Sequence, residues 1–274
     1  MVNLSVFSVV DTGHNAIKNL QNTYPFDFIN RGKRNLVVTV GDSWTWGADM
    51  TPDNNNEYRI KHHFGRLLAD NLNADWLSLA QSGSGNFWMY DRIKELATVI
   101  PKLAYDRIYV VCTLTETGRA VSTRQDIDFY KFFQHNHPNE FIKYLNNLCV
   151  DNIVSALKPF DNIVLKVGTN FVDYLGNDYD FIMPTPWLEL MCQRHNIEYT
   201  DNCQIVSSWV IDEFKQLGNL VPGTQLNNYL NLLNSLLDSA LKRRNLVRSV
   251  PDTNYSHPMA QSHKLWADYV LKSM

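Results

Sequence analysis

A serine that directly follows a short apolar run is the first residue that could do chemistry. Residues 36–40 read Leu-Val-Val-Thr-Val, and Gly41-Asp42-Ser43 follows at once. An apolar, β-branched run of this length is typical of a buried strand that enters a tight turn. In open α/β sheets, catalytic groups collect at the C-terminal ends of the strands. Ser43 is therefore a candidate nucleophile, unless Asp42 or Ser43 merely caps the turn.

A candidate base lies late in the chain. A serine hydroxyl is a weak nucleophile and needs a base within hydrogen-bond reach, and the base works best when a third group fixes its tautomer. His257 follows Asp252 and Asn254 closely. We therefore predict that His257 is the base and that Asp252 or Asn254 orients it. A Ser–His dyad and an exposed loop histidine without a role are the alternatives.

A glycine-rich turn offers donors for an oxyanion. The tetrahedral intermediate of acyl transfer needs preorganised N–H groups, which a turn at a helix N-terminus supplies. Residues 81–86 read Gln-Ser-Gly-Ser-Gly-Asn between a predicted strand and a predicted helix. The backbone amides of Ser43 and Gly85 are thus predicted donors. The simpler interpretation of Gly85 is that it only permits the turn.

The elements that must position these residues alternate along the chain. The sequence predicts strands over 36–42, 75–80, 108–112 and 162–168, and helices over 58–72, 87–103, 140–157, 225–244 and 259–274. Such alternation indicates a parallel sheet with helices on both faces and right-handed crossovers. We expect an α/β fold, namely a flavodoxin-like three-layer α/β/α sandwich with a mainly parallel central sheet.

No linker divides the chain into two domains. We predict that residues 1–34 form an N-terminal extension packed on the core and that residues 35–274 form a single α/β domain. Residues 169–222 are the least regular part and are predicted to be an insertion, with one further strand over 203–210. Residues 120–138 are expected to be a surface excursion.

Composition excludes several classes of protein. The chain has 274 residues, of which 45% are hydrophobic and 19% charged, so it can bury a large core. The net charge of −3 leaves no basic footprint for nucleic acid. Neither a signal-peptide pattern nor an apolar run of about 18 residues is present, so the sequence predicts a soluble, cytoplasmic protein.

Cysteines and neighbouring histidines give no metal signature. The cysteines form no CxxC pair, which favours buried free thiols in a reducing compartment and leaves a Cys192–Cys203 bridge open. His62 and His63 are adjacent and cannot share a helix face. The sequence therefore predicts neither a metal nor a cofactor. His263 is expected at the surface or at a helix cap.

Three blocks together carry a family resemblance. Gly41-Asp42-Ser43 with Gly47, then Gly85-Asn86, then the run from Asn254 to Pro258 follow one another in the order seen in SGNH/GDSL hydrolases, which the chain resembles over residues 36–270. The resemblance implies a serine esterase or lipase-like acyl hydrolase. Its substrate would be a small ester or an acylated carbohydrate, for example one that carries O-acetyl groups.

Two positions depart from the family pattern. The third block usually supplies an oxyanion asparagine, yet the third predicted strand ends in Thr115-Glu116, so Thr115 or Asn170 would have to replace it. The second departure is Asn254, which stands where the family has an aspartate. The residues expected to line the substrate cleft are Asp42, Trp44, Asn86 and Glu116, although Glu116 is favoured to form an internal ion pair.

A function of a different class stays open because of these departures. The same fold could serve as a non-hydrolytic SGNH-like binding or structural protein, for example a component of a phage particle, and the protein would then reside in a virion. The sequence leaves the oligomeric state open.

Overall fold

The computed structural model describes most of the predicted α/β domain. The described residues are 27–51, 55–115, 138–171, 179–199, 244–255 and 257–274, with five further positions between 231 and 242. The expected strand over 203–210, the excursion over 120–138 apart from its last residue, Glu116 and Cys203 lie outside the described residues.

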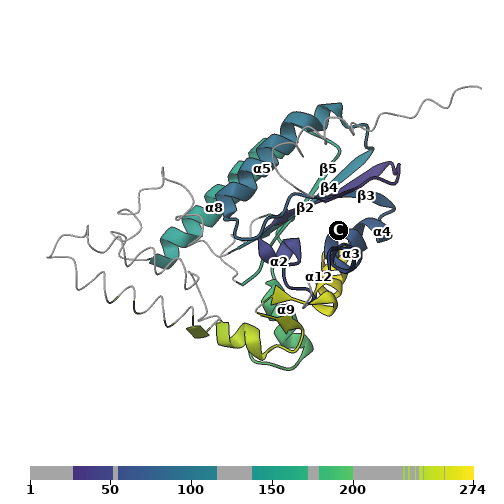
Figure 1. Ribbon diagram of the computed structural model, residues 1–274. Coiled ribbons are helices and arrows are strands. Elements are labelled where there is room, and N and C mark those ends of the chain that lie inside the picture. Colours follow the sequence, from purple (N-terminus) through teal and green to yellow (C-terminus); the bar gives the residue numbers. More distant parts are fainter. Residues whose placement is uncertain are drawn as a thin grey trace, which may run out of the picture.

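Within the described residues, a five-stranded sheet forms the middle layer (Figure 1). Its spatial order is β1-β3-β2-β4-β5, and only β1 at the edge is antiparallel to its neighbour. The strands are β1 (Phe28–Ile29), β2 (Asn35–Gly41), β3 (Ala74–Ser78), β4 (Arg107–Leu114) and β5 (Ile163–Thr169). The predicted α/β fold with a mainly parallel sheet is confirmed.

Helices cover both faces of this sheet, as Figure 1 shows. Leu36, Val38 and Val110 are buried against α5 and α8 on one face, and Val37 and Val111 lie in the core under α4, α9 and α12 on the other. Strands buried on both faces read as continuous apolar runs, which is why the sequence revealed them. Among the helices whose bounds lie within the described residues, those of eight residues or more are α4 (Phe64–Asn71), α5 (Asn86–Val99), α8 (Pro138–Leu157), α9 (Trp187–Arg194) and α12 (Ala260–Ser273).

The strand order places the end of β2 at the topological switch point of the sheet. From β2 the chain continues into β3 on one side of it, and then into β4 on its other side. In open α/β sheets, ligands bind at such a reversal, outside the carboxyl ends of the strands. Ser43 begins the short helix α2 (Ser43–Trp46) at this point.

The helix predicted over residues 58–72 is broken at His63. It forms α3 (Asn56–His62) and α4, because His63 adopts an extended backbone conformation and its Nδ1 accepts a hydrogen bond from the Gly65 amide at 2.9 Å. A residue that caps the start of a helix has a non-helical backbone, so the preceding helix cannot continue through it. The sequence also missed α9, which lies in the predicted insertion.

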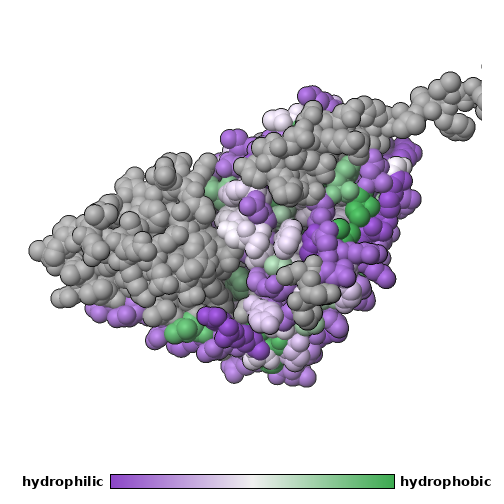
Figure 2. Space-filling model, viewed as in Figure 1, coloured by the Kyte–Doolittle hydropathy of each residue, from purple (hydrophilic) through white to green (hydrophobic). Residues whose placement is uncertain are grey.

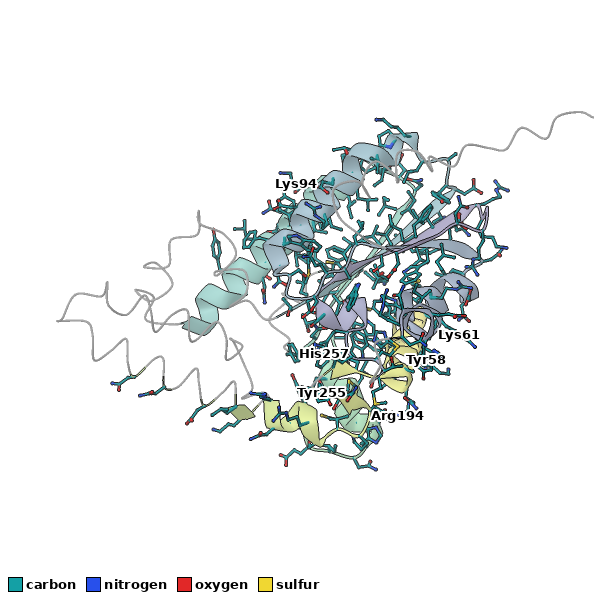
Figure 3. All side chains as sticks on the ribbon, viewed as in Figure 1. Tyr58, Lys61, Lys94, Arg194, Tyr255 and His257 are labelled. Carbon is teal, nitrogen blue, oxygen red and sulfur yellow. The ribbon has the colours of Figure 1, made fainter. Side chains whose placement is uncertain are left out.

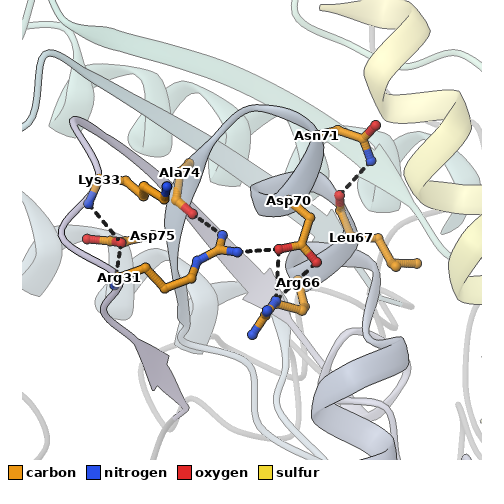
Figure 4. Close-up of polar contacts among 8 residues, drawn as sticks. All are labelled: Arg31, Lys33, Arg66, Leu67, Asp70, Asn71, Ala74 and Asp75. Carbon is orange, nitrogen blue, oxygen red and sulfur yellow. Dashed lines mark hydrogen bonds and ion pairs between the residues drawn. The ribbon is translucent and has the colours of Figure 1, made fainter.

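The residues before β2 are fastened to the sheet edge (Figure 4). The buried Asp75 carboxylate accepts hydrogen bonds from the backbone amides of Arg31 at 2.7 Å and Lys33 at 3.2 Å. The Arg31 guanidinium donates to the Ala74 carbonyl and pairs with Asp70. Residues 27–34 therefore pack on the core, while the division into an extension and one domain stays a prediction.

Hydrophilic residues dominate the described surface in the view of Figure 2, and the hydrophobic ones are scattered in small groups. None of the described helices is long and apolar enough to cross a membrane.

Candidate active site

A one-turn helix presents Ser43 at the end of β2. Asp42 is its N-cap, since Asp42 Oδ1 accepts from the Trp44 amide at 3.0 Å. Gly47 ends the turn in the left-handed conformation, with a φ of 80°. At Gly41 a Cβ atom would lie 1.9 Å from Thr45 Oγ1, so only glycine lets the helix fold back against the strand end. The Gly-Asp-Ser sequence thus sets the direction of the Ser43 side chain.

The structure brings Ser43 and His257 together. His257 Nε2 lies 3.1 Å from Ser43 Oγ, although the two residues are 214 positions apart. His257 sits on β7 (His257–Pro258), which pairs with β6 (Thr253–Asn254) in a small hairpin that the sequence did not predict. Figure 3 shows His257 beside the short helix α2. This distance is within hydrogen-bond reach of a nucleophile and its base.

Asp49 is the carboxylate nearest to the other nitrogen of His257. The distance from Asp49 Oδ2 to His257 Nδ1 is 2.9 Å, although the direction departs from that of a linear N–H···O bond. Catalytic hydrogen bonds are often poorly aligned before substrate binds and tighten afterwards. Asp49 comes from the same turn as Ser43, six residues later. Nothing in its spacing distinguishes Asp49 from an ordinary turn aspartate, so the sequence did not predict its place beside His257.

Asn254 connects Asp49 to the hairpin that carries His257. Its Nδ2 donates to the Asp49 carbonyl at 2.8 Å, and Asn254 faces His257 across the two-stranded hairpin. Asp49 has a φ of 53°, a left-handed conformation that aspartate tolerates better than most residues. The predicted role of Asn254 as the group that orients His257 directly is wrong, because Asn254 holds the backbone of the carboxylate residue instead.

Asp252 does not contact His257. Its Oδ2 lies 2.8 Å from His195 Nε2 and 3.4 Å from Arg194 Nε, both at the end of α9. Its carbonyl accepts from the Met259 amide at 2.8 Å. The prediction that Asp252 orients the base is therefore wrong, and Asp252 instead fastens the hairpin to α9.

Asp42 is a buried hub beneath the nucleophile. Its side chain is 0% exposed, and Asn170 Nδ2 donates to Oδ1 at 2.9 Å while Thr115 Oγ1 donates to Oδ2 at 2.7 Å. Thr115 and Asn170 follow β4 and β5, so one carboxyl group joins three neighbouring strand ends. The Thr115 amide donates to Asn86 Oδ1 at 2.8 Å. Both Thr115 donors are therefore used inside the protein, which contradicts its predicted oxyanion role, and Asn170 is directed at Asp42.

The residues expected in the substrate cleft are mostly buried. Asn86 Nδ2 donates to the Thr115 carbonyl at 3.1 Å and to Asn146 Oδ1 at 3.3 Å. Trp44 packs edge-on against Phe171, with ring centroids 4.5 Å apart. Asp42, Trp44 and Asn86 thus support the site from below and do not line it.

The loop that carries Gly85 is tied to the strand end before Ser43. The Gln81 amide donates to the Gly41 carbonyl at 3.1 Å, and Ser84 Oγ donates to the same oxygen at 3.0 Å. Gly85 is the N-cap of α5, and Ser43 is the first residue of α2. Amides in the first turn of a helix have no acceptor within the helix. The predicted oxyanion role of the Ser43 and Gly85 amides stays a prediction.

Two buried histidines, His63 and His263, lie close to the Ser43 turn, and His63 contacts it directly. His63 Nε2 donates to the Thr45 carbonyl in α2, and His63 Nδ1 accepts from Gly65, so the ring is neutral. Burial, together with the nearby Arg59 guanidinium, lowers the pKa of His63 from 6.5 to about 3. Burial also lowers the pKa of His263, whose ring packs on Phe64. Its Nδ1 accepts from the amide of Phe64, the first residue of α4, at 3.3 Å. The expected surface position is therefore wrong, whereas this contact agrees with the expected helix cap.

These histidines predict a loss of stability in mild acid. Between pH 6.5 and about 3, His63 is protonated in the unfolded chain but stays neutral in the folded protein. The free energy of unfolding therefore falls as the pH falls through this range. The slope is about 1.4 kcal/mol per pH unit and per histidine. Urea unfolding at pH 7.0 and 5.0 measures it. The variant His263→Phe should flatten the pH dependence, and an unchanged slope in this variant would contradict the assignment.

Metal ligands do not gather in the part of the chain that the structure describes, where no group of three or more His, Cys, Asp or Glu residues could hold an ion. Cys112, Cys149 and Cys192 are buried, and burial raises the pKa of the Cys112 thiol.

Comparisons with known proteins give remote structural likenesses. No protein-family model matches the sequence, and no curated protein matches it. A family two carbohydrate esterase from Clostridium thermocellum, solved in complex with cellohexaose, is 15% identical with a TM-score of 0.41. The alignment covers 88% of this chain, and the chain spans 63% of the length of that esterase.

Two further solved structures cover most of both chains. A member of the lipolytic protein G-D-S-L family from Veillonella parvula is 12% identical with a TM-score of 0.37, covering 87% of this chain and 97% of that one. An acetyl xylan esterase from Geobacillus stearothermophilus is 11% identical with a TM-score of 0.33, covering 89% and 95%. These likenesses are remote, and the chemistry of this chain therefore has to follow from its own contacts.

Proposed function

We propose that this chain is a serine hydrolase that cleaves acyl esters, with Ser43 as nucleophile, His257 as general base and Asp49 as the orienting carboxylate. The observation that carries the proposal is the 3.1 Å contact between Ser43 Oγ and His257 Nε2, with Asp49 2.9 Å from the opposite ring nitrogen. A serine, an imidazole and a carboxylate in this sequence of contacts form the arrangement that activates a hydroxyl for acyl transfer.

The contacts define the roles in each step. Ser43 Oγ attacks the ester carbonyl carbon while His257 Nε2 accepts its proton, and the same proton passes to the oxygen of the leaving alcohol as the C–O bond breaks. Water then attacks the acyl-enzyme with His257 as base again, which releases the acid and restores Ser43. The Asp49 carboxylate stabilises the imidazolium that forms in both steps.

The Ser43 and Gly85 amides are the proposed oxyanion donors. Each lies at the start of a helix, and the Gly85 loop is anchored to the strand that ends at Ser43. Preorganised amides act on the charge that develops in the transition state, and losing one such donor typically costs about 2.7–4 kcal/mol of barrier.

Small acyl esters are the proposed substrates, and O-acetyl groups on carbohydrate are the class that the sequence resemblance implies. The non-hydrolytic alternative was motivated partly by the missing aspartate before His257. Asp49 lies where that carboxylate is needed, which supports hydrolysis over a purely binding or structural role.

A serine-directed fluorophosphonate tests the proposed nucleophile. We expect one adduct per chain, located on Ser43 by peptide mass spectrometry, and none in Ser43→Ala. His257→Ala should slow labelling by about 100-fold or more, because the hydroxyl loses its base. Absence of an adduct on the folded wild-type protein would contradict the proposal.

A further inference from the structure

The turn of the hairpin that carries His257 presents an exposed aromatic side chain. Tyr255 follows β6 and has a φ of 47°, and 79% of the residue is exposed. It is the most exposed large hydrophobic residue among those that the structure describes. Figure 3 shows Tyr255 close to His257, on the same side of the molecule.

The left-handed backbone of Tyr255 and the exposure of its ring both lower the stability of the folded protein. A left-handed backbone brings Cβ close to the carbonyl oxygen, so Gly and Asn are the usual residues at hairpin turns with positive φ. An aromatic ring in water leaves a large apolar surface hydrated. Since the ring is mostly exposed, packing offsets little of either cost. Unfavourable backbone conformations that persist in this way cluster at functional sites.

The position of Tyr255 places it at the rim of the proposed active site. It is two residues from His257, so their Cα atoms are at most about 7 Å apart. His257 Nε2 in turn lies 3.1 Å from Ser43 Oγ. The residue before it, Asn254, holds the Asp49 backbone on the other side of the hairpin. A substrate group attached to the reacting ester is therefore within reach of the tyrosine ring.

We propose that Tyr255 is a substrate-binding residue that stacks on a ring in the alcohol part of the ester. This inference rests on the proposed esterase function. A phenol ring offers a flat apolar face and a hydroxyl that hydrogen-bonds at one end, which suits a ring that carries both C–H faces and polar substituents. An aryl group and a sugar share this flat face. Tyr255 thus favours esters of cyclic alcohols over esters of short alkyl alcohols.

The variants Tyr255→Gly and Tyr255→Phe test this role. For each, kcat/KM is measured with an acetylated methyl glucoside, phenyl acetate and ethyl acetate. In Tyr255→Gly we expect the ratio of kcat/KM for a ring ester to that for ethyl acetate to fall at least about fivefold, mainly through KM. Tyr255→Phe keeps the ratio within about twofold, because the stacking face remains. The glucoside and the phenyl ester distinguish sugar from aryl recognition.

Stability supplies a readout that separates binding from a structural role. Glycine suits the left-handed turn, so Tyr255→Gly should raise Tm by roughly 2 °C. Tyr144→Ala is the matched control, because Tyr144 is an exposed tyrosine on α8, on the other face of the sheet. It should leave the ester ratio unchanged. An unchanged ratio in Tyr255→Gly, or equal losses for all three esters with a lower Tm, would overturn the proposal.

A binding measurement keeps this inference separate from the catalytic proposal. Calorimetry on Ser43→Ala with the acetylated methyl glucoside and with phenyl acetate needs no hydrolysis. Adding Tyr255→Gly should weaken binding of at least one ring ester about fivefold. If Ser43→Ala binds a ring ester through Tyr255 but the wild type hydrolyses none of the three esters, the catalytic proposal fails and the binding role of Tyr255 stands. Binding that is indifferent to Tyr255 would overturn this one alone.

Discussion

Asp49→Asn is expected to lower kcat for ester hydrolysis about 100- to 1,000-fold with little change in KM. Asparagine keeps the size of the side chain, but it cannot stabilise an imidazolium by charge, and its amide favours the wrong tautomer of His257. Asp49 is 35% exposed, so water can replace part of its effect and the loss should be smaller than for a buried triad carboxylate. Steady-state kinetics with a short-chain chromogenic ester measures it.

Asp252→Asn is the matched control for Asp49. Asp252 is the aspartate closest to His257 in the sequence, yet it contacts His195 and Arg194. We expect kcat to stay within about threefold of wild type, since no atom that touches His257 changes. A large loss in Asp252→Asn together with a small loss in Asp49→Asn would reverse the assignment of the carboxylate.

Asp42→Ala should destabilise the fold by about 3–5 kcal/mol, because it leaves three buried donors without their acceptor. These donors are the Trp44 amide, Thr115 Oγ1 and Asn170 Nδ2. Since they belong to the ends of β2, β4 and β5, the Ser43 turn should lose its fixed direction as well. Chemical unfolding followed by circular dichroism measures the change.

Asp42→Asn separates hydrogen bonding from side-chain volume. Its Oδ1 can still accept from Trp44 and Asn170, and the Thr115 hydroxyl can rotate to accept from the new amide. The expected cost is roughly 1–2 kcal/mol. If Asp42→Ala costs no more than Asp42→Asn, Asp42 would not be the hub that joins the strand ends.

The sequence revealed the middle of the sheet and the two residues that meet at the end of β2. β2 and β4 are buried on both faces, so their apolar runs are unbroken and hard to mistake for helices. Ser43 was found because the local Gly-Asp-Ser pattern fixes a turn at a strand end, and His257 because it lies in a late Asn-to-Pro block.

The partners of those residues depend on contacts that sequence distance does not encode. Asp49 meets His257 only because the hairpin folds back over the Ser43 turn, so Asp252, which is nearer in sequence, was the wrong choice. His263 was expected at the surface or at a helix cap. Its ring packs in an aromatic core, and its Nδ1 accepts from the first amide of α4. Polar residues that are buried with partners follow no periodic pattern.

The measurement that tests the catalytic centre most directly is hydrolysis of a short-chain chromogenic ester by the wild type and by Ser43→Ala, with both proteins shown to be folded. The contact between Ser43 Oγ and His257 Nε2 predicts saturable hydrolysis by the wild type and a loss of more than about 1,000-fold in Ser43→Ala. Equal rates in the two proteins would contradict it.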